Sequence, residues 1–192
     1  MGKATFLFSV FFSFLLIGAS AQAQRNDIAL TGGGFAAVSN PLDLGLAWAL
    51  EGTYAHEIKS LPMVSVAAEL PIAGSFHSPI PTLSNLTVTS GYSSLFITPG
   101  VRLRLAPSFF ISPYLAAGIG YGRFNQTLFT GGTAANGSAA FDIGGGLDLK
   151  VLPFISLRGE IRDFNSGGLG LQTLAFGRQN NLFLTFGVAV RF

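Results

Sequence analysis

The sequence has no cysteine, and only 10% of its residues are charged, against about 25% in typical soluble proteins. Without cysteine the chain can form neither a disulfide framework nor a thiolate metal site, and it cannot be anchored through a lipid-modified cysteine. The formal net charge of +2 gives no reason to expect a nucleic-acid partner. After Ala23 no apolar run reaches the length of about 18 residues that a transmembrane helix needs. The mean hydropathy is nevertheless +0.52, so the apolar residues are dispersed along the chain.

The first residues have the pattern of a secretory signal peptide. Lys3 precedes an apolar run over residues 4–17, and Ala21-Gln22-Ala23 supplies an A-x-A cleavage site. The apolar run is shorter than the ~20 residues of a bilayer helix, which favours cleavage over a membrane anchor. We therefore predict a signal peptide over residues 1–23 and a single domain over residues 24–192.

The rest of the chain alternates with a period of two residues. Over residues 95–105, the odd positions are Leu, Ile, Pro, Val, Leu and Leu, whereas the even positions are Phe, Thr, Gly, Arg and Arg. Successive side chains of a strand leave opposite faces of a sheet, so this pattern predicts strands. They are long enough to cross a bilayer at a tilt, which takes about 9–11 residues. We expect eight such strands, over residues 26–39, 44–58, 62–75, 92–105, 110–124, 138–152, 154–165 and 181–192.

The connections between these segments differ in length at the two ends of the predicted strands. Pro62, Pro107 and Pro153 mark three tight turns. Three other connections are long and rich in Gly, Ser, Thr and Asn, over residues 76–91, 125–137 and 166–180. Short turns at one end and longer loops at the other are typical of outer-membrane barrels. The sequence thus predicts an all-β fold, an eight-stranded antiparallel up-and-down transmembrane β-barrel.

Alternation alone does not tell which face of the barrel points outward, because a secreted lipocalin-like barrel alternates too, with its apolar face inside. Here the apolar face is bulky, and an eight-stranded barrel encloses little more than side-chain volume. The other face has few charges for a water-exposed surface. Gly118, Gly120 and Gly122 share one face, as a tight interior would require. We predict that the apolar face contacts lipid.

The opposite, inward face then carries acidic and basic residues in similar numbers. A buried charge has to be paired or hydrated. We predict a network of ion pairs that plugs the lumen, with a polar channel as the alternative. The predicted network consists of Glu51, Glu69, Arg102, Arg104, Asp142, Asp148, Lys150, Arg158, Glu160, Arg162 and Arg191.

An A-x-A signal, eight amphipathic strands and a final strand that ends in phenylalanine are features that resemble the small bacterial outer-membrane barrels, namely the OmpA-type transmembrane domain and OmpX-like proteins. The resemblance implies a location in the bacterial outer membrane, among lipopolysaccharide and phospholipid. It also implies that the last strand is recognised by the outer-membrane assembly machinery. The residues that would carry this assembly signal are Leu184, Phe186, Val188, Val190 and Phe192.

Signals for catalysis are weak. His77, with Ser75 or Ser78, is the one local candidate for a lipid-modifying His–Ser pair, and a loop flanked by proline holds a proton relay poorly. Residues 32–37 match a dinucleotide fingerprint formally, but Asn40-Pro41 would stop the helix that the fingerprint needs. We expect no enzymatic activity, no cofactor and no metal.

The function predicted from the sequence is a structural or surface-interaction role, with an extracellular partner bound through the loops. Three alternatives remain open at this point: a narrow conduit for small hydrophobic molecules like the OmpW-like barrels, a lipid-modifying enzyme of the outer leaflet, and a secreted lipocalin-like binding barrel.

Overall fold

A computed structural model describes residues 25–37, 46–76, 89–128, 133–166 and 179–192. The predicted signal peptide over residues 1–23 lies outside this part of the chain, as do His77 and Ser78. Within the described ranges, the search for a helix that is long and apolar enough to span a membrane finds none.

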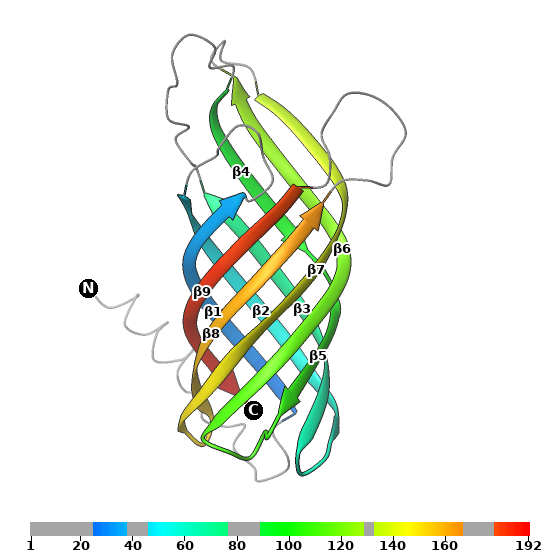
Figure 1. Cartoon of the computed structure of the whole chain (residues 1–192), viewed down its shortest axis with the longest axis vertical. Helices are drawn as coiled ribbons and strands as arrows, with labels where there is room; N and C mark the ends of the chain where they lie inside the picture. The colour runs from blue at the N-terminus through cyan, green and yellow to red at the C-terminus, as the bar shows by residue number, and fades with distance from the viewer. Residues whose placement is uncertain (1–24, 38–45, 77–88, 129–132, 167–178) are drawn as a thin grey trace, which may run out of the picture.

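The strands form one closed antiparallel sheet (Figure 1). β1 pairs with both β2 and β9, so the first and last strands close the barrel. β4 and β5 follow each other along one wall of the barrel, between β3 and β6, and together count as one strand. The predicted eight-stranded up-and-down barrel is therefore confirmed. The strand bounds are β1 (Asn26–Ala37), β2 (Leu46–Ser60), β3 (Val64–Phe76), β4 (Thr89–Ile97), β5 (Gly100–Leu105), β6 (Ile111–Leu128), β7 (Thr133–Leu152), β8 (Ile155–Ser166) and β9 (Gln179–Arg191).

The break between β4 and β5 was not expected, because the alternation runs through it without a gap. It falls at Thr98 and Pro99, opposite Pro71 of β3. Proline has no N–H to donate to the ladder. Only longer bonds bridge the break, from Thr98 N–H to the Pro71 carbonyl at 3.4 Å and from Ile119 N–H to the Pro99 carbonyl at 3.1 Å. Two prolines on neighbouring strands thus interrupt regular pairing while side-chain alternation continues.

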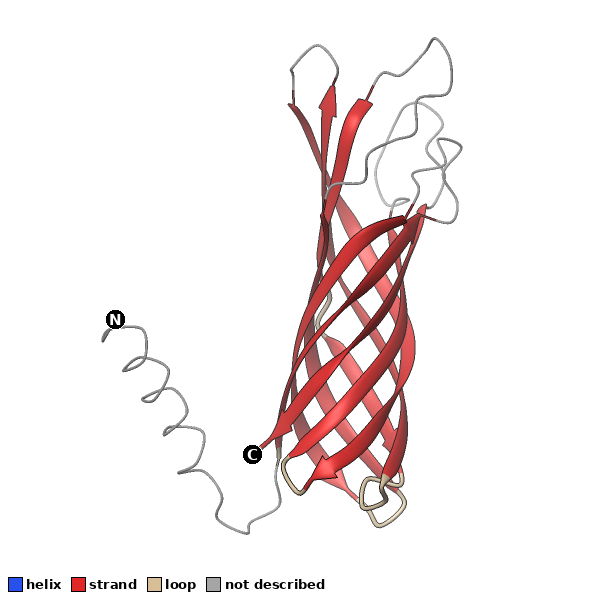
Figure 2. Ribbon diagram, turned by 90° about the vertical axis from the view of Figure 1, so that its left-hand side faces the viewer, coloured by secondary structure: helices blue, strands red, loops and turns tan. Residues whose placement is uncertain are grey.

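A second difference concerns residues 125–137, for which the prediction of a long loop was wrong. β6 and β7 continue as a paired hairpin up to Thr127 and Thr133. Figure 2 shows β4, β6 and β7 rising above the other strands at the loop end of the barrel. Gly, Ser, Thr and Asn in this segment suggested a loop, but pairing across the hairpin overrides that local preference.

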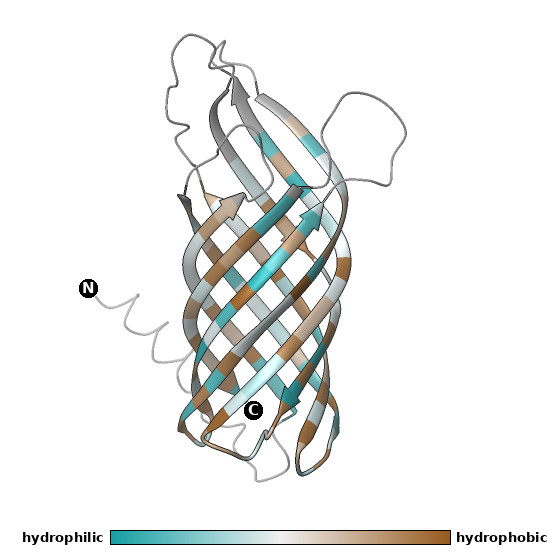
Figure 3. Ribbon diagram, in the orientation of Figure 1, coloured by the Kyte–Doolittle hydropathy of each residue, from teal (hydrophilic) through white to brown (hydrophobic). Residues whose placement is uncertain are grey.

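The two faces of the sheet are chemically distinct, as the alternating colours of Figure 3 show. Outward side chains are large and apolar, with Trp48 79% exposed and Ile119 76% exposed. Inward side chains include Arg102 and Arg158, which are almost completely buried. Burial of a large apolar side chain is favourable by about 1.5–3 kcal/mol, so this exterior requires lipid rather than water. The lipocalin-like alternative, with an apolar interior and a polar surface, does not fit this arrangement.

Candidate functional site

The interior nearest the three short turns, here called the short-turn end, holds a ring of arginines around two aspartates. Strand register creates its pairs, since Asp27 lies opposite Arg191 across β1 and β9, and Asp148 lies opposite Arg158 across β7 and β8. Arg158 binds Asp148 through Nε at 2.7 Å, and Arg191 Nη2 lies 2.8 Å from the same carboxylate. Arg104 Nη2 lies 3.0 Å from both Asp27 and Asp148. Arg104, Arg158 and Arg191 thus each contact both carboxylates.

Further from the short turns along the lumen, Arg162 is surrounded by four carboxylates. Its guanidinium lies 2.5 Å from Glu160, 2.6 Å from Asp142, 2.9 Å from Glu69 and 3.6 Å from Glu51. These acids come from β2, β3, β7 and β8, so a single side chain connects four strands across the lumen. We call this cluster the Arg162 hub.

Arg102 joins the ring to the hub. Its guanidinium contacts Glu69 at 2.7 Å and Asp27 at 3.4 Å. It also lies over the ring of Tyr114, 4.6 Å from the centroid, where a cation–π contact adds to the ion pairs. Tyr114 in turn donates its hydroxyl to Glu160 at 2.7 Å. The charged groups therefore form one continuous network.

The structure brings ten of the predicted network residues together and leaves one out. Lys150 is half-buried and forms no ion pair with any described residue. Asp27 and Tyr114 belong to the network but were not predicted. The alternation of Asp27, Ala29 and Thr31 with Ile28 and Leu30 contains the signal that would have found Asp27. Tyr114 is uncharged, so a search for inward charges did not find it.

Toward the loop end, the interior changes from ionic to aromatic. Phe35, Phe96, Phe164 and Phe183 are completely buried in the lumen. Phe96 stacks on Phe164 with a centroid distance of 4.8 Å and meets Phe183 edge-on at 5.9 Å. Gly122 makes room for this cluster, since a Cβ there would lie 2.9 Å from the Phe96 ring. The sequence analysis missed this cluster, although alternation already placed Phe96 and Phe183 on the inward face.

The ionic network and the phenylalanine cluster together fill the barrel from the short turns to the loops. Guanidinium groups, carboxylates and phenyl rings occupy the axis, and the largest of these side chains are fully buried. Such a filled interior is the plug that the sequence predicted, not an open channel. A buried ion network is held in place by its mutual partners, because loss of one partner leaves an uncompensated charge.

The predicted assembly signal lies on β9, the closing strand. Leu184, Phe186 and Val188 point outward and are well exposed, whereas Val190 is partly covered. Phe192 follows Arg191, the last residue of β9, at the short-turn end, where it exchanges two backbone hydrogen bonds with Asn26, at 2.9 and 3.0 Å. The residues share the lipid face, and their recognition by assembly machinery stays a prediction.

The structure does not place the described residues among the weak catalytic candidates in a catalytic arrangement. Ser75 points into the lumen, where its hydroxyl bonds to the Ser94 hydroxyl at 2.7 Å. Gly32 and Gly34 lie within β1, paired to β2 and β9, so they do not form the strand-to-helix turn of a dinucleotide site. Among the described residues, no group of three or more His, Cys, Asp or Glu is arranged to hold a metal ion.

A closed eight-stranded barrel with an apolar exterior and a charged, filled interior has the fold of the small outer-membrane β-barrels, which reside in the bacterial outer membrane. No protein-family model matches the chain, and no curated protein matches it in sequence.

Solved structures give three comparisons. The chain resembles the Neisserial surface protein A (NspA) at 17% sequence identity and a TM-score of 0.58, over 87% of this chain and 97% of that one. It resembles the N-terminal β-barrel domain of Pseudomonas aeruginosa OprF at 14% identity and a TM-score of 0.54, over 89% and 100%. It also resembles Ail, the attachment invasion locus protein of Yersinia pestis, at 12% identity and a TM-score of 0.52, over 88% and 97%. The predicted likeness to small outer-membrane barrels is confirmed at the level of the fold.

Proposed function

We propose that this barrel serves as a docking platform at the cell surface, with its contact face on the extension formed by the upper ends of β4, β6 and β7. We call this extension the ledge. The observation that carries the proposal is the upper edge of β7. Pairing between β7 and β8 begins at Ala140 and Ser166, so residues 133–139 pair with β6 alone among the described residues. In the part of the chain that the structure describes, the ledge therefore presents a sheet edge beyond the barrel wall.

The chemistry of this edge suits strand addition. Ala135, Asn136, Gly137 and Ala139 are all exposed. Exposed sheet edges are usually protected by lysine, proline or a bulge, and residues 133–139 contain neither lysine nor proline. Backbone N–H and C=O groups along such an edge can pair with an extended segment of another protein. The proposed partner is accordingly an extracellular protein with an accessible extended segment.

A polyanionic glycan is a less suitable partner for the ledge. Ail has been solved in complex with the heparin analogue sucrose octasulfate. Recognition of sulfate groups requires clustered basic side chains. The described part of the ledge has one basic residue, Arg123, which is exposed. We therefore expect heparin to bind poorly.

The test removes the ledge and keeps the barrel. Replacing residues 123–137 by an Asn-Gly turn joins Gly122 to Ser138, which lie opposite one another. Cells that display the shortened protein should lose adherence to a surface coated with serum proteins, and neither version should adhere to a heparin-coated surface. A heat-dependent shift on a denaturing gel reports whether the barrel is intact.

A double variant distinguishes the edge from the bulk of the ledge. Ala135→Lys with Ala139→Lys adds charge along the β7 edge, and Arg123→Gln serves as a control on β6. Loss of adherence in the lysine variant alone supports strand addition. Full adherence of either the lysine variant or the shortened protein, with an intact barrel, would contradict the proposal.

The platform is proposed to act without catalysis. In support, the Ser75 hydroxyl is occupied by Ser94 inside the lumen and is turned away from lipid. An assay of lipid deacylation with the His77→Ala variant tests this point. Deacylation by the unmodified protein that disappears in the variant would establish an enzyme instead.

A further inference from the structure

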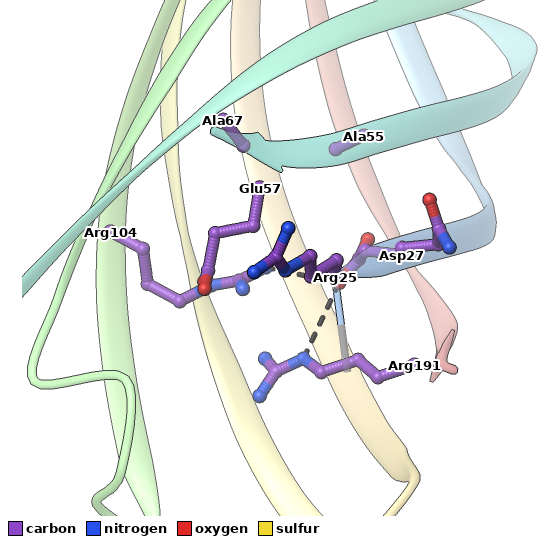
Figure 4. Close-up of a pocket in the computed structure, with 8 residues that line it drawn as sticks. Arg25, Asp27, Ala55, Glu57, Ala67, Arg104 and Arg191 are labelled. Carbon is purple, nitrogen blue, oxygen red and sulfur yellow. Dashed lines mark hydrogen bonds and ion pairs between the residues drawn. The ribbon is translucent and has the colours of Figure 1, made fainter. Parts of the chain in front are cut away.

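A small cavity lies at the short-turn end of the lumen, between the ends of β1, β2, β3, β5 and β9. Its volume of about 10 Å³ is room for one water-sized particle. Figure 4 shows the charged side chains converging on it from several strands. The lining consists of Arg25, Asn26, Asp27, Ala55, Glu57, Ala67, Arg104 and Arg191.

The walls of this cavity carry more positive than negative charge. The lining has three guanidinium groups, those of Arg25, Arg104 and Arg191, and two carboxylates, those of Asp27 and Glu57. Three positive charges against two negative charges leave a surplus of one. The neighbouring arginines outside the lining do not add to it, because Arg158 is matched by Asp148 and Arg102 by Glu69, each at 2.7 Å.

Hydrogen-bond donors are in surplus at the same place. Arg104 is more than nine-tenths buried and lines the cavity, and its Nε has no hydrogen-bond partner among the described residues. Nη1 of Arg158, in the same ring, is also without a partner. A buried charged donor is stabilised by an acceptor, and an anion is the strongest acceptor available to a guanidinium.

We propose that this cavity binds one small monovalent anion, either chloride or the end of a single carboxylate. Arg104 and Arg191 are the buried basic groups of the lining, and Arg25 is its exposed basic group. The volume sets the size limit, since it admits one ion or the tip of a carboxylate but not a tetrahedral phosphate or sulfate. The surplus of one positive charge sets the valence. In the outer-membrane orientation, with short turns toward the periplasm, the ion would come from that side.

Chloride binding can be measured directly on the folded mature protein in detergent micelles. Protein-dependent broadening of the ³⁵Cl NMR line, at constant ionic strength, is the expected result. Acetate and phosphate are then added as competitors. Displacement of chloride by acetate identifies a carboxylate as an equal ligand, retention of chloride identifies the halide, and phosphate should displace neither. No broadening by the folded protein, or displacement by phosphate ahead of acetate, would overturn the proposal.

Two variants at the exposed Arg25 and the half-buried Glu57 test the location without disturbing the ring. Arg25 forms no ion pair with a described residue, so Arg25→Gln should fold and weaken chloride binding roughly threefold, as expected for one exposed charge. Glu57→Gln, which removes one of the two negative charges from the lining, should strengthen binding. Lys59→Gln is the matched control, because it removes one exposed positive charge from the same end of β2 outside the lining. Equal broadening in all three variants would also overturn the site.

Discussion

The two halves of the lumen are both filled by side chains, but one half is filled by charged groups and the other by aromatic rings. Toward the short turns, Arg162 and its neighbours fill the barrel with charges that satisfy one another. Toward the loops, Phe96 and its neighbours fill it with rings. The ionic half depends on specific partners, because each charge without its counterpart is costly. The aromatic half depends on volume and shape, and tolerates changes that preserve both. Substitutions should therefore separate the two halves clearly.

The largest effect is expected from Arg162→Met. The side-chain volume stays similar, but four carboxylates lose their shared cation, so the free energy of unfolding should fall by about 3–5 kcal/mol. Urea titration of the protein in micelles or vesicles measures the change. Glu51→Gln is the matched comparison, because Glu51 is the most distant of the four acids at 3.6 Å. A cost for Glu51→Gln equal to that of Arg162→Met would show that the hub is not organised around the arginine.

A smaller effect is expected when the aromatic half is overfilled. Gly122→Ala places a Cβ against the Phe96 ring and should destabilise the barrel by about 1–3 kcal/mol. Combination with Phe96→Leu should recover part of the loss, because the smaller side chain makes room. A double-mutant cycle with no coupling between the two positions would argue against this contact as the source of the strain.

Phe96→Leu alone is expected to cost less than about 1.5 kcal/mol, since leucine is only moderately smaller than phenylalanine and keeps an apolar group in the cluster. The same urea titration applies. The comparison between the halves predicts that this value is well below the one for Arg162→Met, although both side chains are fully buried. Similar costs would mean that volume, not charge, determines stability along the whole lumen.

The smallest effect is expected for Lys150→Gln. Lys150 forms no ion pair within the described part of the chain, so its loss should change the free energy of unfolding by less than about 0.5 kcal/mol. A larger loss would indicate that the ionic half extends to this residue.

Much of the fold follows from one sequence property. Because period-two alternation continues over long segments, the number of strands, their direction and most inward charges could be predicted without a structure. Asp142 and Arg162 were assigned to the lumen in this way, and they lie 2.6 Å apart. The alternation could not predict which charges would be partners, because that depends on strand register and on side chains that cross the lumen.

Other features lie outside the reach of the pattern. Phe96 and Phe183 were inward by alternation, but a phenyl ring alone does not reveal whether it is surrounded by lipid or by other rings. The ledge was hidden by a composition typical of loops. The interruption at Pro99 depends on Pro71 of the neighbouring strand, and pairing between strands is not encoded locally. The small cavity near Arg104 is formed by residues at the ends of five strands, and residue spacing in the sequence does not predict it.

The contact between Asp27 and Arg191 has a consequence for the order of folding. These residues are 164 positions apart, and Asp27 also binds arginines from β5 and β8. Its carboxylate finds all of its partners only after the last strand has arrived beside the first. Closure therefore has the highest cost in loop-closure entropy, and the ion pairs that offset this cost form only at the end of folding. Weakening this junction should slow the final closure more than it affects the early pairing of neighbouring hairpins, so the junction works as a latch that sets the folding rate.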